Sequence, residues 1–223
     1  MFEAVIFDWD GTLADTKEAI LISFHKALHS IHCDATDEFI ERRIGIGAAE
    51  TFREILRAQK VSFDEKIIEK LVDIKIQAEI DLSNEIPLFP GAFELLQMLQ
   101  GKVKLGLASM NNKRVIEHLL MTTQTAKFFN SVVTTEEVAA SKPNPAIFLK
   151  CASKLGTAPE KCVVIEDSIF GVEAAKAAKM GCIAVLTGVY SRDELEQAKA
   201  DLIVDSLTEK NNISAFNFGS TST

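Results

Sequence analysis

Two carboxylates stand one residue apart near the start of the chain. An apolar run over residues 4–7 leads straight into Asp8, and Asp10 and Gly11 follow. In an open α/β sheet, ligands bind just outside the carboxyl ends of the strands. Two acids at such a place repel each other and are costly to dehydrate unless a cation compensates them. Asp8 and Asp10 are therefore candidates for a nucleophile and a metal site, although a solvated turn favours the same residue types.

A second apolar run, over residues 103–108, ends in a hydroxyl. Ser109 follows it directly, and Met110 and Asn111 come next, before a predicted helix. The free N–H groups at a helix start suit phosphate oxygens. An ordinary Ser/Asn helix cap is the alternative interpretation of this segment.

A lysine and a second acidic pair complete the set. Lys142 precedes a helix that starts near Pro145, and Glu166 and Asp167 end the apolar run 162–165. A lysine at this place can bind a phosphoryl oxygen. The alternative interpretation is that Lys142 is an ordinary surface lysine before a helix that starts with proline. Glu166 and Asp167 could equally stabilise the start of the following helix through its dipole. If all four segments meet at one edge of a sheet, their excess negative charge indicates a hard cation such as Mg²⁺.

The elements that must position these residues alternate along the chain. Strands are predicted at residues 4–7, 103–108, 132–133, 162–165 and 182–186, with helical patterns between the later ones. Such alternation predicts an α/β fold, a Rossmann-like parallel sheet with helices on both faces. Residues 16–86 read as nearly continuous helix. The prediction is thus a catalytic core of residues 1–15 and 87–223 carrying an inserted helical cap of residues 16–86.

In order and spacing, these motifs resemble the haloacid dehalogenase superfamily of phosphotransferases, in the branch with a helical cap after the first strand. The resemblance runs from about Val5 to Leu207. It rests on D-x-D-G-T-L, which starts at Asp8, and on E-D-S, which starts at Glu166. The overall pattern is similar to phosphoglycolate phosphatases and β-phosphoglucomutases.

The resemblance implies a role for each matching residue. Asp8 is expected to be the nucleophile that forms an aspartyl phosphate, and Asp10 to protonate the leaving oxygen and later activate water. The remaining expectations are phosphoryl binding by Ser109, Met110, Asn111 and Lys142, Mg²⁺ held by Asp8, the Asp10 carbonyl, Asp167 and Glu166, and a hinge into the cap at Asp15.

The expected function is hydrolysis of a small phosphorylated metabolite, phosphoglycolate-like or a sugar phosphate; nucleotides and pyrophosphate stay open. A sugar-phosphate mutase of the same family is one alternative. Resembling mutases carry a histidine in the first cap helix and an arginine after the cap glycine, where this chain has Ile20 and Ile46. A catalytically silent phosphometabolite sensor is the alternative from another class.

Two other activities of the family are less favoured. A haloacid dehalogenase does not need the second acid of the first motif, and Asp10 is present. A phosphonate hydrolase would need a cap lysine for a Schiff base. None of the cap lysines stands in a sequence context that singles it out: Lys17, Lys60, Lys66, Lys70 and Lys75.

Specificity is expected from the cap, around Arg43 and the glycines Gly45 and Gly47. The cap also carries His25 and His29, with His32 predicted on the same helical face. Their spacing resembles a zinc helix, but no glutamate follows His25, so the H-E-x-x-H motif is absent. Because a metal site needs more than two aligned ligands, a solvated or cap-packing face is predicted.

Composition bounds the partners and the location. The 223 residues carry a net charge of -8, which argues against nucleic acid or an anionic membrane as partner. No apolar run is long enough to span a bilayer, and the N-terminus lacks a basic signal region, so a cytoplasmic location is expected. No protein partner is implied. The four cysteines are expected to be reduced thiols in or near the core, and residues 211–223 to be loosely held.

Overall fold

The fold is taken from a computed structural model, which describes residues 1–214 and 216. Six parallel strands form one sheet in the order β3-β2-β1-β4-β5-β6. The order reverses at β1, which lies between β2 and β4, and such a reversal is where ligands bind in this class of sheet. The strands are β1 (Ala4–Phe7), β2 (Lys104–Ala108), β3 (Ser131–Val133), β4 (Cys162–Glu166), β5 (Gly181–Val185) and β6 (Leu202–Val204).

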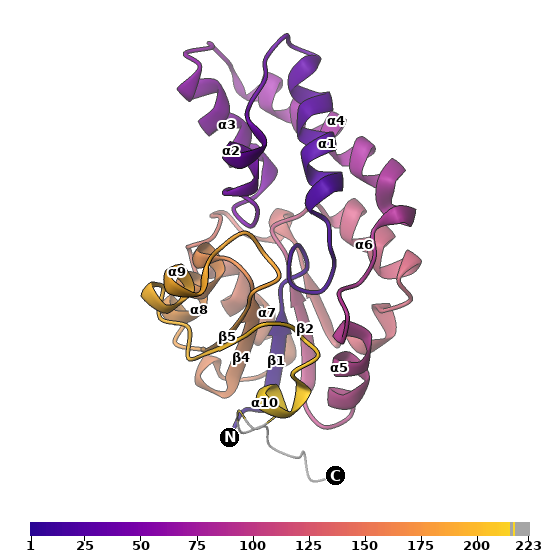
Figure 1. The fold of residues 1–223 in the computed structure, drawn as a ribbon, viewed down its shortest axis with the longest axis vertical. Coiled ribbons are helices and arrows are strands. Elements are labelled where there is room, and N and C mark those ends of the chain that lie inside the picture. The colour runs from indigo at the N-terminus through magenta and orange to yellow at the C-terminus, as the bar shows by residue number, and fades with distance from the viewer. Residues whose placement is uncertain (215, 217–223) are drawn as a thin grey trace.

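Helices cover both faces of the sheet because alternate side chains of each strand point to opposite faces. Val5 and Phe7 pack in one apolar cluster with α5, α6 and α10, whereas Ala4 and Ile6 pack in another with α7, α8 and α9. The predicted α/β fold is therefore confirmed (Figure 1). These helices are α5 (Ala92–Leu99), α6 (Lys113–Thr122), α7 (Ala146–Leu155), α8 (Ile169–Ala177), α9 (Arg192–Gln197) and α10 (Lys210–Ser214).

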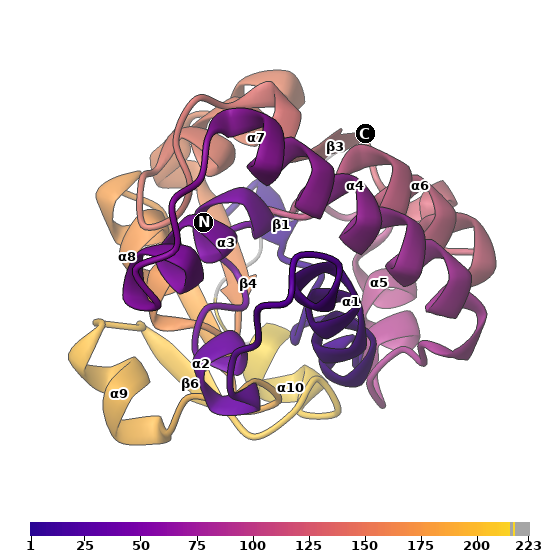
Figure 2. The ribbon, with the colours of Figure 1, turned by 90° about the horizontal axis from the view of Figure 1, so that it is seen from above.

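Of the helices between β1 and β2 in the chain, the first four stand above the carboxyl edge of the sheet (Figures 1 and 2). They share an apolar cluster of their own, built around Phe24, Phe52 and Leu71. The segment predicted as nearly continuous helix is thus four helices joined by turns: α1 (Lys17–His29), α2 (Asp37–Glu41), α3 (Ala48–Ala58) and α4 (Glu65–Leu82). Short 3₁₀ helices occur at η1 (Ser83–Glu85), η2 (Ala126–Phe128), η3 (Thr135–Glu137) and η4 (Pro159–Lys161).

The two linkers between the sheet and these helices run side by side. The Asp15 N–H donates to the Pro87 carbonyl at 3.0 Å, and the Phe89 N–H donates to the Leu13 carbonyl at 2.9 Å. This pairing supports the proposal that the cap, residues 16–86, joins the core at Asp15 and near residue 87. The core segment 87–223 ends in residues 215 and 217–223, which lie outside the described part.

Some sequence expectations change at helix ends. Helix α1 ends at His29 and His32 has a φ of 57°, so the prediction that His32 shares the helical face was wrong. In the segment predicted to be loosely held, Ile213 is buried within α10. Cys151, Cys162 and Cys182 are buried. Among the described residues, every helix is too short or too polar to cross a membrane.

Candidate active site

A buried lysine lies between two carboxylates at the carboxyl edge of the sheet. Lys142 Nζ is 2.6 Å from Asp8 Oδ1, just beyond β1, and 2.6 Å from Glu166 Oε1, at the end of β4. Both oxygens of Glu166 are occupied, because Oε2 accepts the N–H groups of Asp167 and Ser168 at 2.8 Å each. Glu166 therefore holds Lys142 in place against Asp8.

Asp167 is enclosed by glycines on two sides. Thr12 Oγ1 donates to Asp167 Oδ1 at 2.9 Å. A Cβ at Gly11 would lie 2.3 Å from Asp167 Oδ2, and a Cβ at Gly188 would lie 2.0 Å from the same atom. Only glycine at both positions leaves room for this carboxylate in its present place. The loop after β5, which carries Gly188, is thus a part of the site that the sequence motifs did not indicate.

The charges of this cluster do not balance. Ligand oxygens of Asp8, Glu166 and Asp167 lie within 4.8 Å of one another, and all three residues are buried. Burial raises the pKa of Asp8 to about 8, against the opposing charge of Lys142. Burial, followed by the charge of Glu166, also raises the pKa of Asp167 well above its usual range. A hard divalent cation fits this all-oxygen, electron-rich set.

Lys142 itself stays an ammonium. Burial alone would lower its pKa, but the charges of Asp8 and Glu166 outweigh that effect and raise it. A permanent positive charge beside Asp8 is what a phosphoryl group arriving there needs, since its oxygens bring further negative charge.

The second acid of the first motif faces the β2–α6 loop. Asp10 accepts hydrogen bonds from Ser109 Oγ at 3.3 Å and from Asn111 Nδ2 at 3.4 Å. Burial raises the pKa of Asp10 to about 6, and the charge of Glu79 adds to the effect. The Ser109 N–H donates a hydrogen bond to the Val133 carbonyl at 3.1 Å.

The expected phosphoryl-binding amides are only partly available. The Asn111 N–H donates to Ser109 Oγ at 3.0 Å. Among the hydrogen bonds of residues 1–214 and 216, none engages the N–H of Met110 or of Trp9, next to Asp8. These two amides are therefore available to a phosphoryl oxygen, whereas the Ser109 hydroxyl would first have to leave Asp10.

A buried charge pair from the cap reaches this loop. Lys75 and Glu79 stand one turn apart on α4, form an ion pair, and are 4% and 0% exposed. Lys75 Nζ also donates to Asn111 Oδ1 at 3.3 Å, and Asn111 Nδ2 donates to Glu79 Oε1 at 2.9 Å. The sequence analysis did not single out Lys75, although a charged pair at positions i and i+4 beside Leu71 on an apolar helix face was a signal for it.

The cap closes over Asp8. The cavity between them has a volume of about 30 Å³, which is room for little more than water. A Cβ at Gly45 would lie 3.7 Å from Ser168 Cβ, so the loop between α2 and α3 rests on the core. The cavity is lined by Asp8, Asp10, Ile20, Phe24, Arg43, Ile44, Gly45, Gly47, Ala48, Thr51, Lys75, Met110 and Asn111.

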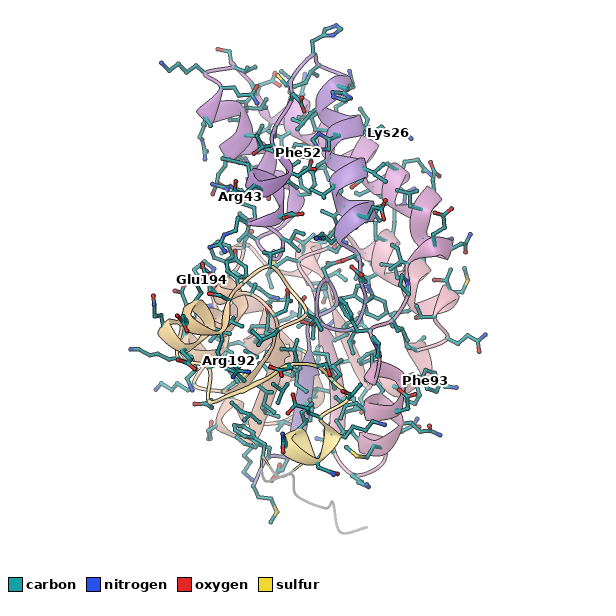
Figure 3. The ribbon with its side chains drawn as sticks, in the orientation of Figure 1. Lys26, Arg43, Phe52, Phe93, Arg192 and Glu194 are labelled. Carbon is teal, nitrogen blue, oxygen red and sulfur yellow. The ribbon has the colours of Figure 1, made fainter. Side chains whose placement is uncertain are left out.

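The predicted specificity residues therefore border the cavity, but Arg43 is already engaged. Its Nε is 2.5 Å from Glu54 Oε2, and its guanidinium stacks on the Phe39 ring at 3.5 Å. The neighbouring Arg42 links the cap to the core through Glu194, 2.5 Å away on α9. Figure 3 shows Arg43 and Glu194 on either side of the junction between cap and core.

The chain is similar to known proteins over most of its length. A family described as Haloacid dehalogenase-like hydrolase matches residues 5–185. The chain is 33% identical over 178 residues to the Phosphorylated carbohydrates phosphatase of Thermotoga maritima, covering 79% of this chain and 81% of that protein.

Solved structures extend the likeness over nearly the whole chain. β-Phosphoglucomutase from Clostridium difficile has a TM-score of 0.84 at 29% identity, over 97% of this chain and 100% of that one. A CbbY variant from Rhodobacter sphaeroides, solved with xylulose-(1,5)bisphosphate, has a TM-score of 0.83 at 30% identity, over 94% of this chain and 96% of that one.

Proposed function

Because the chain belongs to the haloacid dehalogenase-like hydrolases, we propose that it is a Mg²⁺-dependent phosphatase that acts through an aspartyl phosphate on Asp8. The observation that carries the proposal is the contact of Asp8 with Lys142 at 2.6 Å, beside the acidic cluster with Asp167. The proposed nucleophile Asp8, the cation Lys142 and the proposed metal ligand Asp167 therefore lie close enough to act on one phosphoryl group.

In the first step, Asp8 attacks phosphorus through an oxygen of its ionised form, which the charge of Lys142 favours, and the ester P–O bond breaks. Asp10, whose pKa of about 6 leaves it partly protonated near neutrality, gives its proton to the leaving oxygen. In the second step, Asp10 takes a proton from water as the water oxygen attacks the aspartyl phosphate. The bond to Asp8 then breaks and inorganic phosphate is released, so two easier steps replace one difficult one.

Mg²⁺ would be held by Asp8, Asp167 and the Asp10 carbonyl, and when bound it neutralises charge on the phosphoryl oxygens. Glu166 faces the same cluster, but its two oxygens are engaged by Lys142 and by backbone N–H groups. We therefore assign Glu166 mainly to holding Lys142. The phosphoryl oxygens would be bound by Lys142, Ser109 and the free amides of Trp9 and Met110, while Asn111 orients Asp10.

The names of two relatives and the residues of the cap support a substrate class. The Thermotoga relative is named for phosphorylated carbohydrates, and the CbbY structure holds a sugar bisphosphate. In this chain Lys75 and Arg43 border the cavity and can meet the hydroxyl or anionic groups of a small sugar phosphate. No protein, nucleic acid or membrane partner is part of the proposal, and the expected location is cytoplasmic.

A sugar-phosphate mutase is the second candidate, because a β-phosphoglucomutase has a TM-score of 0.84 with this chain. A mutase must bind a second phosphate opposite Asp8. The cavity wall there includes Ile20, which is 4% exposed, and the Gly45–Gly47 loop. Ile20, and Ile46 in the loop, stand where resembling mutases carry a histidine and an arginine, which favours hydrolysis over phosphoryl return.

The test is phosphate release from a panel of small phosphoesters, with Mg²⁺ and with EDTA, and with Asp8→Asn as the control. Phosphoglycolate, pentose and hexose phosphates, nucleotides and pyrophosphate make up the panel. We expect Mg²⁺-dependent release that Asp8→Asn abolishes, highest for a sugar phosphate. If nothing is released while a sugar bisphosphate primes isomerisation, the mutase assignment replaces this one. Silence in both assays would indicate a sensor.

A further inference from the structure

A second metal-binding group lies on the cap, away from Asp8. His25 and His29 are one turn apart on α1, and the loop that leads to α2 brings Asp34 beside them. His25 Nδ1 is 3.2 Å from Asp34 Oδ1, and His29 Nε2 is 3.9 Å from the same oxygen. One ligand atom from each of the three residues lies within 4.8 Å of the others.

The sequence offered two histidines, and the fold adds the third ligand. With metal–nitrogen bonds of about 2.0–2.1 Å, neighbouring ligand atoms of a tetrahedral site are roughly 3.4 Å apart. The 3.2 Å contact already has this length, and a small rotation of the exposed His29 side chain would shorten the 3.9 Å one. Three ligands leave one position open for water or a small ligand.

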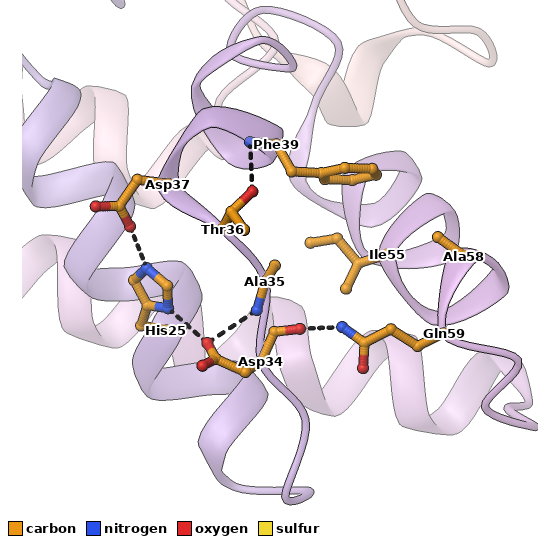
Figure 4. Close-up of a pocket in the computed structure, with 9 residues that line it drawn as sticks. All are labelled: His25, Asp34, Ala35, Thr36, Asp37, Phe39, Ile55, Ala58 and Gln59. Atoms are coloured by element: carbon orange, nitrogen blue, oxygen red, sulfur yellow. Dashed lines mark hydrogen bonds and ion pairs between the residues drawn. The ribbon is translucent and has the colours of Figure 1, made fainter.

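The far side of the His25 ring supports the assignment independently. His25 Nε2 is 2.7 Å from Asp37 Oδ1, on the side opposite to Asp34 (Figure 4). Histidines that bind metals through one ring nitrogen almost always donate the other N–H to a carboxylate or carbonyl. Donation from Nε2–H to Asp37 would leave Nδ1 free to bind an ion between Asp34 and His29.

The loop that supplies the third ligand is anchored. Asp34 Oδ1 accepts the Ala35 N–H at 2.8 Å, and the Gln59 side chain at the end of α3 donates to the Asp34 carbonyl. Thr36 caps α2 by accepting the Phe39 N–H at 3.2 Å. Figure 4 shows these contacts around one open groove of about 700 Å³ beside His25. The backbone that carries Asp34 is therefore held in place beside His25.

We propose that His25, His29 and Asp34, oriented by Asp37, form a transition-metal site that binds a Zn²⁺-like cation. Two imidazole nitrogens select zinc-like ions over Mg²⁺, which prefers oxygen ligands. The site ties the end of α1 to the loop before α2. Its ligand His25 follows Phe24, which lines the cavity over Asp8, so the ion would stiffen the cap next to the substrate.

The test is Zn²⁺ titration of the full chain by calorimetry, after EDTA treatment and in excess Mg²⁺, which keeps the Asp8 cluster occupied. We expect one Zn²⁺ per chain, and a tetrahedral visible spectrum when Co²⁺ replaces it. His25→Gln and His29→Gln should each weaken binding at least about a hundredfold. Asp37→Asn should weaken it about 10–100-fold, as is usual for residues that orient a metal ligand.

Three variants are matched controls. His32→Gln changes an exposed histidine on the same cap, His118→Gln changes one in the core, and Cys33→Ser removes the nearest thiol; all three should bind Zn²⁺ as the wild type does. The proposal is overturned if the wild type takes up no Zn²⁺ in excess Mg²⁺. In that case the contacts of His25 with Asp34 and Asp37 serve only to pack the cap. Binding that survives His25→Gln and His29→Gln, or that depends on Cys33, overturns it equally.

Discussion

At the scale of single residues, the site is defined by buried charge that is held ready for a cation. Asp8 and Glu166 share Lys142, Asp167 lies beside them, and the carboxylates Asp8 and Asp167 have a raised pKa. A cluster of this kind costs stability in the free protein because like charges are confined away from water. The same confinement makes each charge effective on a bound phosphoryl group, where the surrounding dielectric is low.

The pH dependence of stability should show this cost. The pKa of Asp8 is raised from 3.8 to about 8, so the folded state holds a proton that the unfolded state releases. The free energy of unfolding in EDTA should therefore fall as pH rises from about 4 to about 8, by at most about 1.4 kcal/mol per pH unit for this group. Urea unfolding at several pH values across this range measures the free energy of unfolding.

Asp8→Asn should make that slope shallower, and Mg²⁺ should reduce it in the wild type by binding the ionised form. The slope should not vanish in the variant, because Asp10 and Asp167 titrate in the same direction. Equal slopes for the two proteins in EDTA would show that the pKa of Asp8 is not raised in the folded protein.

The Lys75–Glu79 pair gives a second test at this scale. Lys75→Met alone leaves the fully buried Glu79 charge without its partner and should cost about 3–5 kcal/mol of stability. The double variant Lys75→Met/Glu79→Leu replaces the pair by apolar groups and should recover most of that loss. Thermal unfolding and kcat/KM are measured together.

Activity should behave differently from stability in that series. If Lys75 meets the substrate, kcat/KM stays lower by about 10–100-fold in the stable double variant, the usual loss for one charged hydrogen bond. A double variant as active as the wild type would assign the pair to cap packing alone. Glu79→Gln, which keeps the hydrogen bond to Asn111, is the milder control.

At the scale of elements, the strands and the motifs at their ends could be predicted from sequence. Apolar runs bounded by polar residues are buried on both faces in a parallel sheet, and Ala4–Phe7 has the predicted bounds. The strand Leu202–Val204 was missed because three residues at a partly exposed edge give no such run. Lys75 and the Gly188 loop were missed for another reason: the tertiary fold brings Lys75 to Asn111 and Gly188 to Asp167.

The histidine cluster shows the same limit. Spacing along α1 aligns His25 with His29, but Asp34 approaches only because the chain turns back after the helix ends. No helical periodicity predicts that approach. Helix ends, and the loops that follow them, are where sequence reasoning had least to use.

The loop after β5 should be as important to metal binding as the motifs themselves. A Cβ at Gly188 would lie 2.0 Å from Asp167 Oδ2, so Gly188→Ala must displace that carboxylate. We expect the Mg²⁺ concentration for half-maximal activity to rise at least about tenfold, with the fold intact. Gly101→Ala is the control: its φ of 77° makes the change a strained one, yet a Cβ there would meet nothing within 4 Å. Equal Mg²⁺ dependence in both variants would contradict the role given to Gly188.

At the scale of the whole molecule, we predict that the cap moves during catalysis. The cavity over Asp8 measures about 30 Å³, which cannot admit a sugar phosphate, and Lys75, Arg42 and the Gly45 loop all bind the core in this closed form. Closure excludes water from the phosphoryl site, and opening is needed for entry and release. The paired linkers at Asp15 and Pro87 are the natural hinge.

A disulfide across the junction tests this movement directly. The Cβ positions of Gly45 and Ser168 are 3.7 Å apart, within the range of about 3.5–4.5 Å found in disulfides. In a Cys33→Ser background, Gly45→Cys/Ser168→Cys should form the bond under mild oxidation and lose nearly all turnover. Reduction should restore it. Each single variant, treated with the same oxidant, should keep its activity.

Both substitutions are expected to lower stability locally, because Gly45 has a φ of 104° and Ser168 caps α8. The reduced double variant is therefore the reference for the oxidised one. Mass spectrometry confirms the disulfide. The ratio of the turnover rates of the oxidised and reduced protein then measures the effect of the disulfide alone. A locked protein that still hydrolyses its substrate at the reduced rate would mean that substrate reaches Asp8 without cap opening. Loss of turnover that dithiothreitol reverses would make cap motion a required step of the cycle, and would place control of access in the few contacts between the Gly45 loop and the core.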